Sequence, residues 1–122
     1  MSDYLPLYHP GGKLPVVTSA AVTAGQLLAV SGNNTVAPTS GAGMALGVAS
    51  SDDPTGGNEI MCFRVGVHNL IASGSIAAGD AVVAASGGAV ATIGSDTVYT
   101  HVVGQALAAA ANGKVLVALR LA

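Results

Sequence analysis

The sequence predicts an all-β fold, a small barrel or sandwich built from a duplicated β-hairpin unit, with an extended N-terminal arm. Many short apolar runs are separated by turns rich in Gly and Asn, at the spacing of about 8–12 residues that is typical of such folds. One turn-and-hairpin pattern is written twice, at residues 21–39 and 75–92. No segment of any length has a helical period.

The repeat extends beyond the hairpin and indicates a duplicated four-strand unit. A shift of 54 residues aligns the two Ala-Gly turns, a shift of 57 aligns a middle strand, and a shift of 54 aligns the last strand. We expect the repeats at about residues 20–67 and 74–121 of a single β domain, residues 16–122. The aligned positions are 24–25 with 78–79, 46–47 with 103–104, and 61, 63, 65 and 67 with 115, 117, 119 and 121.

Strands are predicted where apolar runs lie between turn signals. The strongest is residues 59–68, in which Met61, Phe63, Val65 and Val67 alternate with other side chains at the period of a half-buried strand. The other predicted strands are residues 16–19, 26–31, 35–37, 44–49, 81–85, 89–93, 97–105 and 114–121.

Turn residues mark both copies of the repeat. Gly and Asn tolerate positive φ, and an Asp after the turn glycine accepts hydrogen bonds from local backbone. Gln26 holds the place of Asp80 in the first copy. The predicted structural turn residues are Gly25, Gly32, Asn33, Asn34, Gly79, Asp80, Gly87 and Gly88.

Residues 1–15 differ from the rest and predict an extended docking arm. Three of the five prolines lie here, and proline excludes both a helix interior and a central strand. The segment also carries apolar anchors, which a disordered linker would lack. Docking on a partner is favoured over packing on its own domain or fraying. The arm residues expected to bind are Tyr4, Leu5, Pro6, Leu7, Tyr8, His9 and Pro10.

The composition excludes several classes of function. Only 8% of the 122 residues are charged and the net charge is −2, so a basic nucleic-acid surface is not expected. No apolar run is long enough for a membrane helix, and the N-terminus does not resemble a signal peptide. A surface with so little charge is poorly protected from association, which favours coverage by other subunits.

No catalytic, metal or cofactor motif is found. The single cysteine, Cys62, is read as a buried strand thiol, and Asp52 and Asp53 as part of a solvated loop. The glycines do not form a phosphate loop, and no Gly-x-Ser-x-Gly elbow occurs. A small hydrolase assembled from His68, His101 and Asp80 is kept as a minor alternative, because none of the three has a motif context.

The duplicated turn resembles a known family. The motifs are VTAGQLL at residues 22–28, IAAGDAV at residues 76–82 and the ending NGKVLVALRL at residues 112–121. They resemble the small capsid decoration, or cement, proteins of tailed bacteriophages, over roughly residues 16–122. The family carries no catalytic residues and no cofactor to transfer.

The resemblance implies a non-enzymatic structural protein on the outer capsid surface of the virion, made in the host cytoplasm. Its expected partners are the major capsid protein, whose capsomers it would bridge, and two further copies of itself in a homotrimer. No nucleic acid or membrane is implied. The arm would add a strand to the capsid protein by β-augmentation. The alternative is a head-fibre or tail-associated binding module that contacts the host surface.

Overall fold

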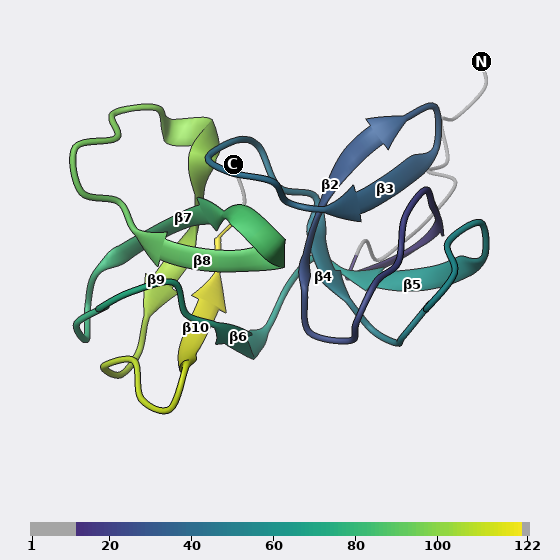
Figure 1. Cartoon of the computed structure of the whole chain (residues 1–122). Coiled ribbons are helices and arrows are strands. Elements are labelled where there is room, and N and C mark those ends of the chain that lie inside the picture. Colours follow the sequence, from purple (N-terminus) through teal and green to yellow (C-terminus); the bar gives the residue numbers. More distant parts are fainter. Residues whose placement is uncertain (1–11, 121–122) are drawn as a thin grey trace, which may run out of the picture.

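The computed structural model describes residues 12–120, which form ten strands and two short 3₁₀ turns (Figure 1). The predicted all-β class is confirmed. The predicted arm falls almost wholly on residues 1–11, outside the described residues, and its boundary at residue 15 stays a prediction. The first strand begins at Lys13.

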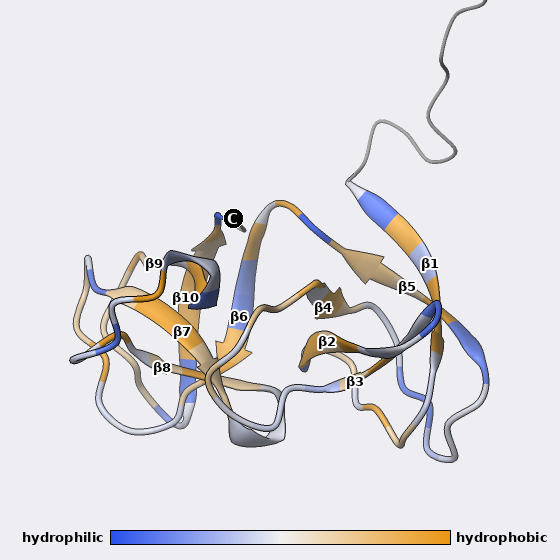
Figure 2. Cartoon of the chain, turned by 90° about the horizontal axis from the view of Figure 1, so that it is seen from above, coloured by the Kyte–Doolittle hydropathy of each residue, from blue (hydrophilic) through white to orange (hydrophobic). Residues whose placement is uncertain are grey.

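The strands divide into two halves of five. The N-terminal half contains β1 (Lys13–Thr18), β2 (Leu27–Gly32), β3 (Thr35–Pro38), β4 (Gly47–Ala49) and β5 (Glu59–Phe63). The C-terminal half contains β6 (Val67–Ile71), β7 (Ala81–Ala85), β8 (Ala89–Thr92), β9 (Val102–Ala106) and β10 (Lys114–Leu119), with the 3₁₀ turns η1 (Ser86–Gly88) and η2 (Tyr99–His101). The halves lie side by side, joined by the segment between β5 and β6 (Figure 2).

The N-terminal half is a closed barrel in the order β1-β3-β2-β4-β5. The strand β1 closes it, because it pairs antiparallel with β5 and parallel with β3. The parallel pair is short, with Thr18 opposite Val36 at its end. A barrel without free edges hides backbone groups that would otherwise recruit other strands.

The C-terminal half repeats this plan in the order β6-β10-β9-β7-β8. An isolated parallel bridge joins Ala72 to Val90, and both residues lie 54 positions after Thr18 and Val36. The middle pairing, Leu28 opposite Gly47, recurs as Val82 opposite Gly104. Each unit therefore has five strands, and the predicted four-strand unit was wrong because β1 and β6 each belong to their own half. Only the N-terminal half is a closed barrel, since the C-terminal sheet has just the isolated bridge at this place.

The strand predicted at residues 59–68 is two strands in different halves. It breaks at residues 64–66, where Gly66 has a φ of 107° that most residues avoid. The buried side chains of β5 are Ile60 and Cys62, and Met61 is exposed.

The shift of 54 assigned to the last strand is also wrong by one residue. Ile60 and Cys62 correspond to the buried Val115 and Val117 at a shift of 55. A slip of one residue in a strand moves every side chain to the opposite face. The apolar character of both faces of β5 concealed this slip.

Each half has its own apolar interior. The N-terminal core comprises Val16, Val22, Leu28, Val36, Ala49, Ile60 and Cys62. The C-terminal core holds their counterparts, Leu70, Ile76, Val82, Val90, Ala106, Val115 and Val117. This correspondence shows that the two halves bury the same positions of one repeated unit.

Candidate interaction surfaces

The turn that opens each copy is built in the same way. Gly25 and Gly79 both have a φ of 89°. The side chain of the next residue folds back onto the backbone, since Gln26 Oε1 accepts from the amide of Thr23 at 2.8 Å and Asp80 Oδ2 accepts from the amide of Ala77 at 2.9 Å. These residues fix the turn, so only their remaining polar atoms are free for contacts.

The hairpin tips also use positive φ. Asn34 has a φ of 56°, Gly87 of 76° and Gly88 of 72°. Asn33 lies in the same turn as Asn34, and Gly32 ends β2 close to the hydroxyl of Thr35. All the residues predicted to mark turns therefore lie at the ends of the hairpins or of the strands beside them.

A row of apolar side chains on the outside of the N-terminal barrel covers one end of the core of the C-terminal half, which we call its mouth. Leu27 pairs with Val48, and Val48 pairs with Phe63, so the three lie on one face across β2, β4 and β5. Leu27 and Val48 are buried in the core of the C-terminal half, together with Ala45, and Phe63 packs against it. We call Leu27, Val48 and Phe63 the plug row.

Polar contacts surround this plug. Thr39 Oγ1 donates to the carbonyl oxygen of Ala85 at 2.7 Å, and Gln26 Nε2 donates to that of Gly87 at 3.1 Å. The amide of Gly88 donates to the Thr39 carbonyl at 3.1 Å. A Cβ at Gly88 would lie 2.7 Å from the Cβ of Gln26, so only glycine fits against the other half. The halves are therefore packed closely at defined residues.

The N-terminal barrel has a groove at the place that corresponds to this covered mouth. The N-terminal groove has a volume of about 520 Å³ and is lined by Leu14, Val16, Val30, Val36, Leu46 and Glu59. Val30 is 65% exposed, and Leu46 is half-buried. Val16 and Val36 are buried, but nothing among the described residues covers Val30 or the exposed part of Leu46.

A second groove lies on the C-terminal half. The C-terminal groove has a volume of about 670 Å³ and is lined by Ala81, Ile93, Val98, Tyr99, Val102 and Arg120. Tyr99 is 86% exposed. Large aromatic side chains with a polar tip are enriched at protein interfaces, so this groove is a candidate contact surface.

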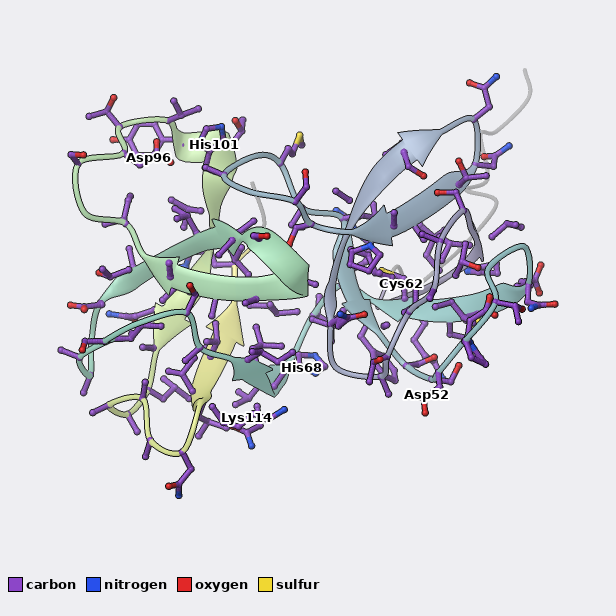
Figure 3. The ribbon with its side chains drawn as sticks, in the orientation of Figure 1. Asp52, Cys62, His68, Asp96, His101 and Lys114 are labelled. Atoms are coloured by element: carbon purple, nitrogen blue, oxygen red, sulfur yellow. The ribbon has the colours of Figure 1, made fainter. Side chains whose placement is uncertain are left out.

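The loop that forms the rim of the C-terminal groove is held by Asp96. Its carboxylate accepts from the amide of Val98 at 2.9 Å and pairs with His101 Nδ1 at 2.7 Å. These two contacts, the amide of Val98 first, lower the pKa of Asp96. Figure 3 shows Asp96 and His101 together on this loop. The pair fixes the loop that presents Tyr99.

Asp53 was predicted to lie in a solvated loop, and this was wrong. Its side chain is only 2% exposed. It accepts hydrogen bonds from the hydroxyl of Thr18, from Asn58 Nδ2 at 2.9 Å and from the amide of Gly56 at 3.1 Å. These contacts, that of Thr18 first, lower the pKa of Asp53 to about 2. Asp53 therefore ties the loop of residues 50–58 to β1.

The family comparison decides what kind of protein carries these surfaces. The sequence model of the phage cement protein family matches residues 8–121, nearly the whole chain. The chain belongs to the phage cement protein family. This cement protein is thus a structural component of a phage head, and the resemblance read from its repeated turn motif is confirmed. Family membership implies a non-enzymatic role.

The architecture of this cement protein recurs in a solved structure. The head fiber gp8.5 N base of bacteriophage phi29 superposes with a TM-score of 0.70 and 19% sequence identity, covering 88% of this chain and 92% of that chain. At this identity the likeness concerns the fold. Among curated proteins, no sequence matches this cement protein.

The residues of the hydrolase alternative are not brought together in this cement protein. His68 bonds the carbonyl of Val65 and stacks on Phe63, whereas His101 pairs with Asp96. Asp80 serves its own turn, and the two histidines lie far apart in Figure 3. Within residues 12–120, no three His, Cys, Asp or Glu side chains gather as metal ligands, and no helix is long and apolar enough to cross a membrane.

The two grooves and the plug row were not predicted from sequence. The predicted arm residues, Tyr4 to Pro10, lie outside the described residues of the cement protein. The repeat positions of the plug row hold small or polar residues in the second copy, Ala81, Gln105 and Ala118, but this difference does not by itself indicate a groove.

Proposed function

We propose that this cement protein decorates the outer surface of an assembled phage head, binds the major capsid protein there and stabilises the contacts between neighbouring capsomers. The match to the phage cement protein family over residues 8–121 carries this proposal. The uncovered apolar grooves support it, because such surfaces on a small soluble domain mark sites of protein contact.

We propose that it acts as a homotrimer whose contacts are individually modest. A low charge density, 8% of residues, favours close association of copies. Several copies bound to a lattice reinforce one another, so weak contacts suffice. A protein that binds only the assembled shell stabilises that shell by linkage.

Residues 1–11 are proposed to dock on the major capsid protein. Removing residues 1–11 tests this, because it leaves the Gly12 carbonyl that accepts from the amide of Arg64 and keeps β1 whole. We expect the shortened chain to fold normally and to lose binding to heads. A shortened chain that still occupied heads fully would refute the role of this segment.

A second candidate is the base of a head fibre that contacts the host surface. The likeness to the head fiber gp8.5 N base of phi29 favours it. Binding of the isolated protein to glycan arrays or to host cells would select this candidate. Binding to heads without any binding to cells would select decoration.

A further inference from the structure

The contact between the two halves uses two surfaces, the plug row and the mouth of the C-terminal half that it covers. Because the halves are copies of one unit, each surface has a counterpart elsewhere in the chain. Neither counterpart is used within residues 12–120. They are the N-terminal groove and the C-terminal groove, which are lined by residues of different halves of the chain.

The N-terminal groove is the counterpart of the covered mouth. Val16, Val36 and Leu46 of the groove correspond to Leu70, Val90 and Val103, which are fully buried in the core that the plug row enters. Val16 and Val36 are buried as well, so the difference between the halves is at Leu46. Leu46 is only half-buried. The plug row covers the core of the C-terminal half, and no side chain from residues 12–120 covers the N-terminal barrel in the same way. The N-terminal groove is therefore a surface that could bind a row of apolar side chains and that residues 12–120 leave unoccupied.

The C-terminal groove lies at one end of the counterpart of the plug row, because Ala81 lines it. Ala81, Gln105 and Ala118 pair across β7, β9 and β10 as Leu27, Val48 and Phe63 pair across β2, β4 and β5. These side chains are smaller. The longer loop before β9 adds the exposed Val98 and Tyr99 beside them, which restores apolar volume on this face.

The C-terminal groove carries a charge of each sign, and the N-terminal groove carries one carboxylate. Asp96, which is paired with His101, and Arg120 line the C-terminal groove, and Glu59 lines the N-terminal groove. Complementary charges across a contact fix its orientation and exclude the reverse pairing. Two N-terminal grooves would bring two Glu59 carboxylates together, whereas the unlike pairing offers Arg120 to Glu59.

We infer that the C-terminal groove of one copy binds the N-terminal groove of a second copy, repeating between chains the contact that joins the halves within one chain. This deepens the self-association in the proposed function and rests on it. The contact is heterologous, because it joins two different surfaces. Each copy therefore uses its C-terminal groove to bind one neighbour and its N-terminal groove to bind another, and the chain of contacts is complete when a ring closes.

The repeat predicts which residues meet. Thr39 and Ala85 touch within the chain, and their counterparts are Ile93 and Ser31. Gln26 and Gly87 touch as well, and their counterparts are Asp80 and Asn33. We therefore expect Ile93 of one copy to lie against Ser31 of the next.

Cross-linking of two singly substituted chains tests this pair. S31C and I93C chains are mixed at high concentration with a short bis-maleimide, and a covalent dimer of two 11.7 kDa chains is expected. Cys62 stays silent, because its burial in β5 raises the pKa of its thiol to about 11. The matched control replaces I93C with A109C, at an exposed residue outside both grooves.

A second variant measures the contact without cross-linking. Y99S should weaken association by roughly tenfold or more in sedimentation, as expected for a central aromatic contact, and should leave the fold intact because Tyr99 is exposed. L107S, at an exposed leucine outside both grooves, is the control and should have no effect.

Each outcome of these experiments either supports or overturns the proposed contact. A dimer with S31C and I93C but not with the control pair supports the contact. Association of copies without this cross-link overturns the contact and leaves the proposed homotrimer standing. A chain that stays monomeric overturns both, while head binding is tested separately. A cross-link that forms only after removal of residues 1–11 shows that the chain's own N-terminal segment fills the groove, and overturns the contact.

Discussion

The hydroxyl of Thr39 donates a 2.7 Å hydrogen bond to the carbonyl oxygen of Ala85, which lies 46 residues further along the chain in the other half. Thr39 is buried, so this bond is shielded from water. It joins the loop after β3 to the end of β7. The two halves of this cement protein are thereby fixed to each other by a specific polar contact as well as by the plug row.

T39V should lower the free energy of unfolding by about 1–3 kcal/mol, because the shape is kept and the part-buried bond from Thr39 to the Ala85 carbonyl is lost. Thermal or urea unfolding measures this. T23V, at an exposed threonine, is the control and should change stability by less than about 0.5 kcal/mol. Equal effects of the two substitutions would contradict the role of the Thr39 bond.

L27A should lower the free energy of unfolding by about 2–5 kcal/mol, since it removes a fully buried side chain from the core of the other half. Urea unfolding gives the value. L107A, at a leucine that is 49% exposed, should cost less than about 1 kcal/mol. A small effect of L27A would mean that the halves do not depend on the plug row.

The turns of the fold could be predicted from sequence because their chemistry is local. Gly25 and Gly79 recur in the same context, and positive φ at both is a property of a few residues. The register of β5 could not, because both of its faces are apolar. Ile60 and Cys62 fill their own barrel, while Phe63 packs against the other half.

The grooves could not be predicted for a related reason. Whether Leu46 is covered depends on what meets the mouth of its barrel, and this is a relation between halves or between chains. Its counterpart Val103 has the same strand context and is fully buried. Sequence periodicity describes one strand at a time and does not distinguish the two.

G88A should destabilise the protein more than G87A. Both glycines have positive φ, so alanine at either carries the strain of that conformation, roughly 1–2 kcal/mol. Only at Gly88 does the new Cβ meet another residue, at 2.7 Å from the Cβ of Gln26. Unfolding free energies of the two variants, measured side by side, isolate the contact between the halves. If the two alanines cost the same, the close approach at Gly88 is not important.

The stability of the protein should depend on Asp53 at acid pH. Its pKa is about 2 in the folded protein against an ordinary value of 3.8, so the carboxylate stabilises the fold above about pH 4 and this contribution is lost as the pH falls towards 2. In D53N the difference in Tm from the natural protein should be large at about pH 5 and shrink towards about pH 2.

The exposed neighbour provides the control for this pH series. D52N removes a charge from the same loop without touching the buried contacts of Asp53 with Thr18 and Asn58. Its Tm difference from the natural protein should be small at neutral pH. A D53N difference that stayed constant over the whole pH range would show that the lowered pKa does not stabilise the fold.

Binding of the purified chain to undecorated, expanded phage heads tests the central claim most directly. Co-sedimentation of heads with increasing amounts of the chain, followed by heating of the decorated heads, gives both occupancy and stabilisation. We expect saturable binding to the expanded shell and disruption of decorated heads at a higher temperature than bare ones, because a ligand of the assembled state stabilises it. Heads that bind no protein, or that bind it and break at the same temperature as bare heads, would contradict the account.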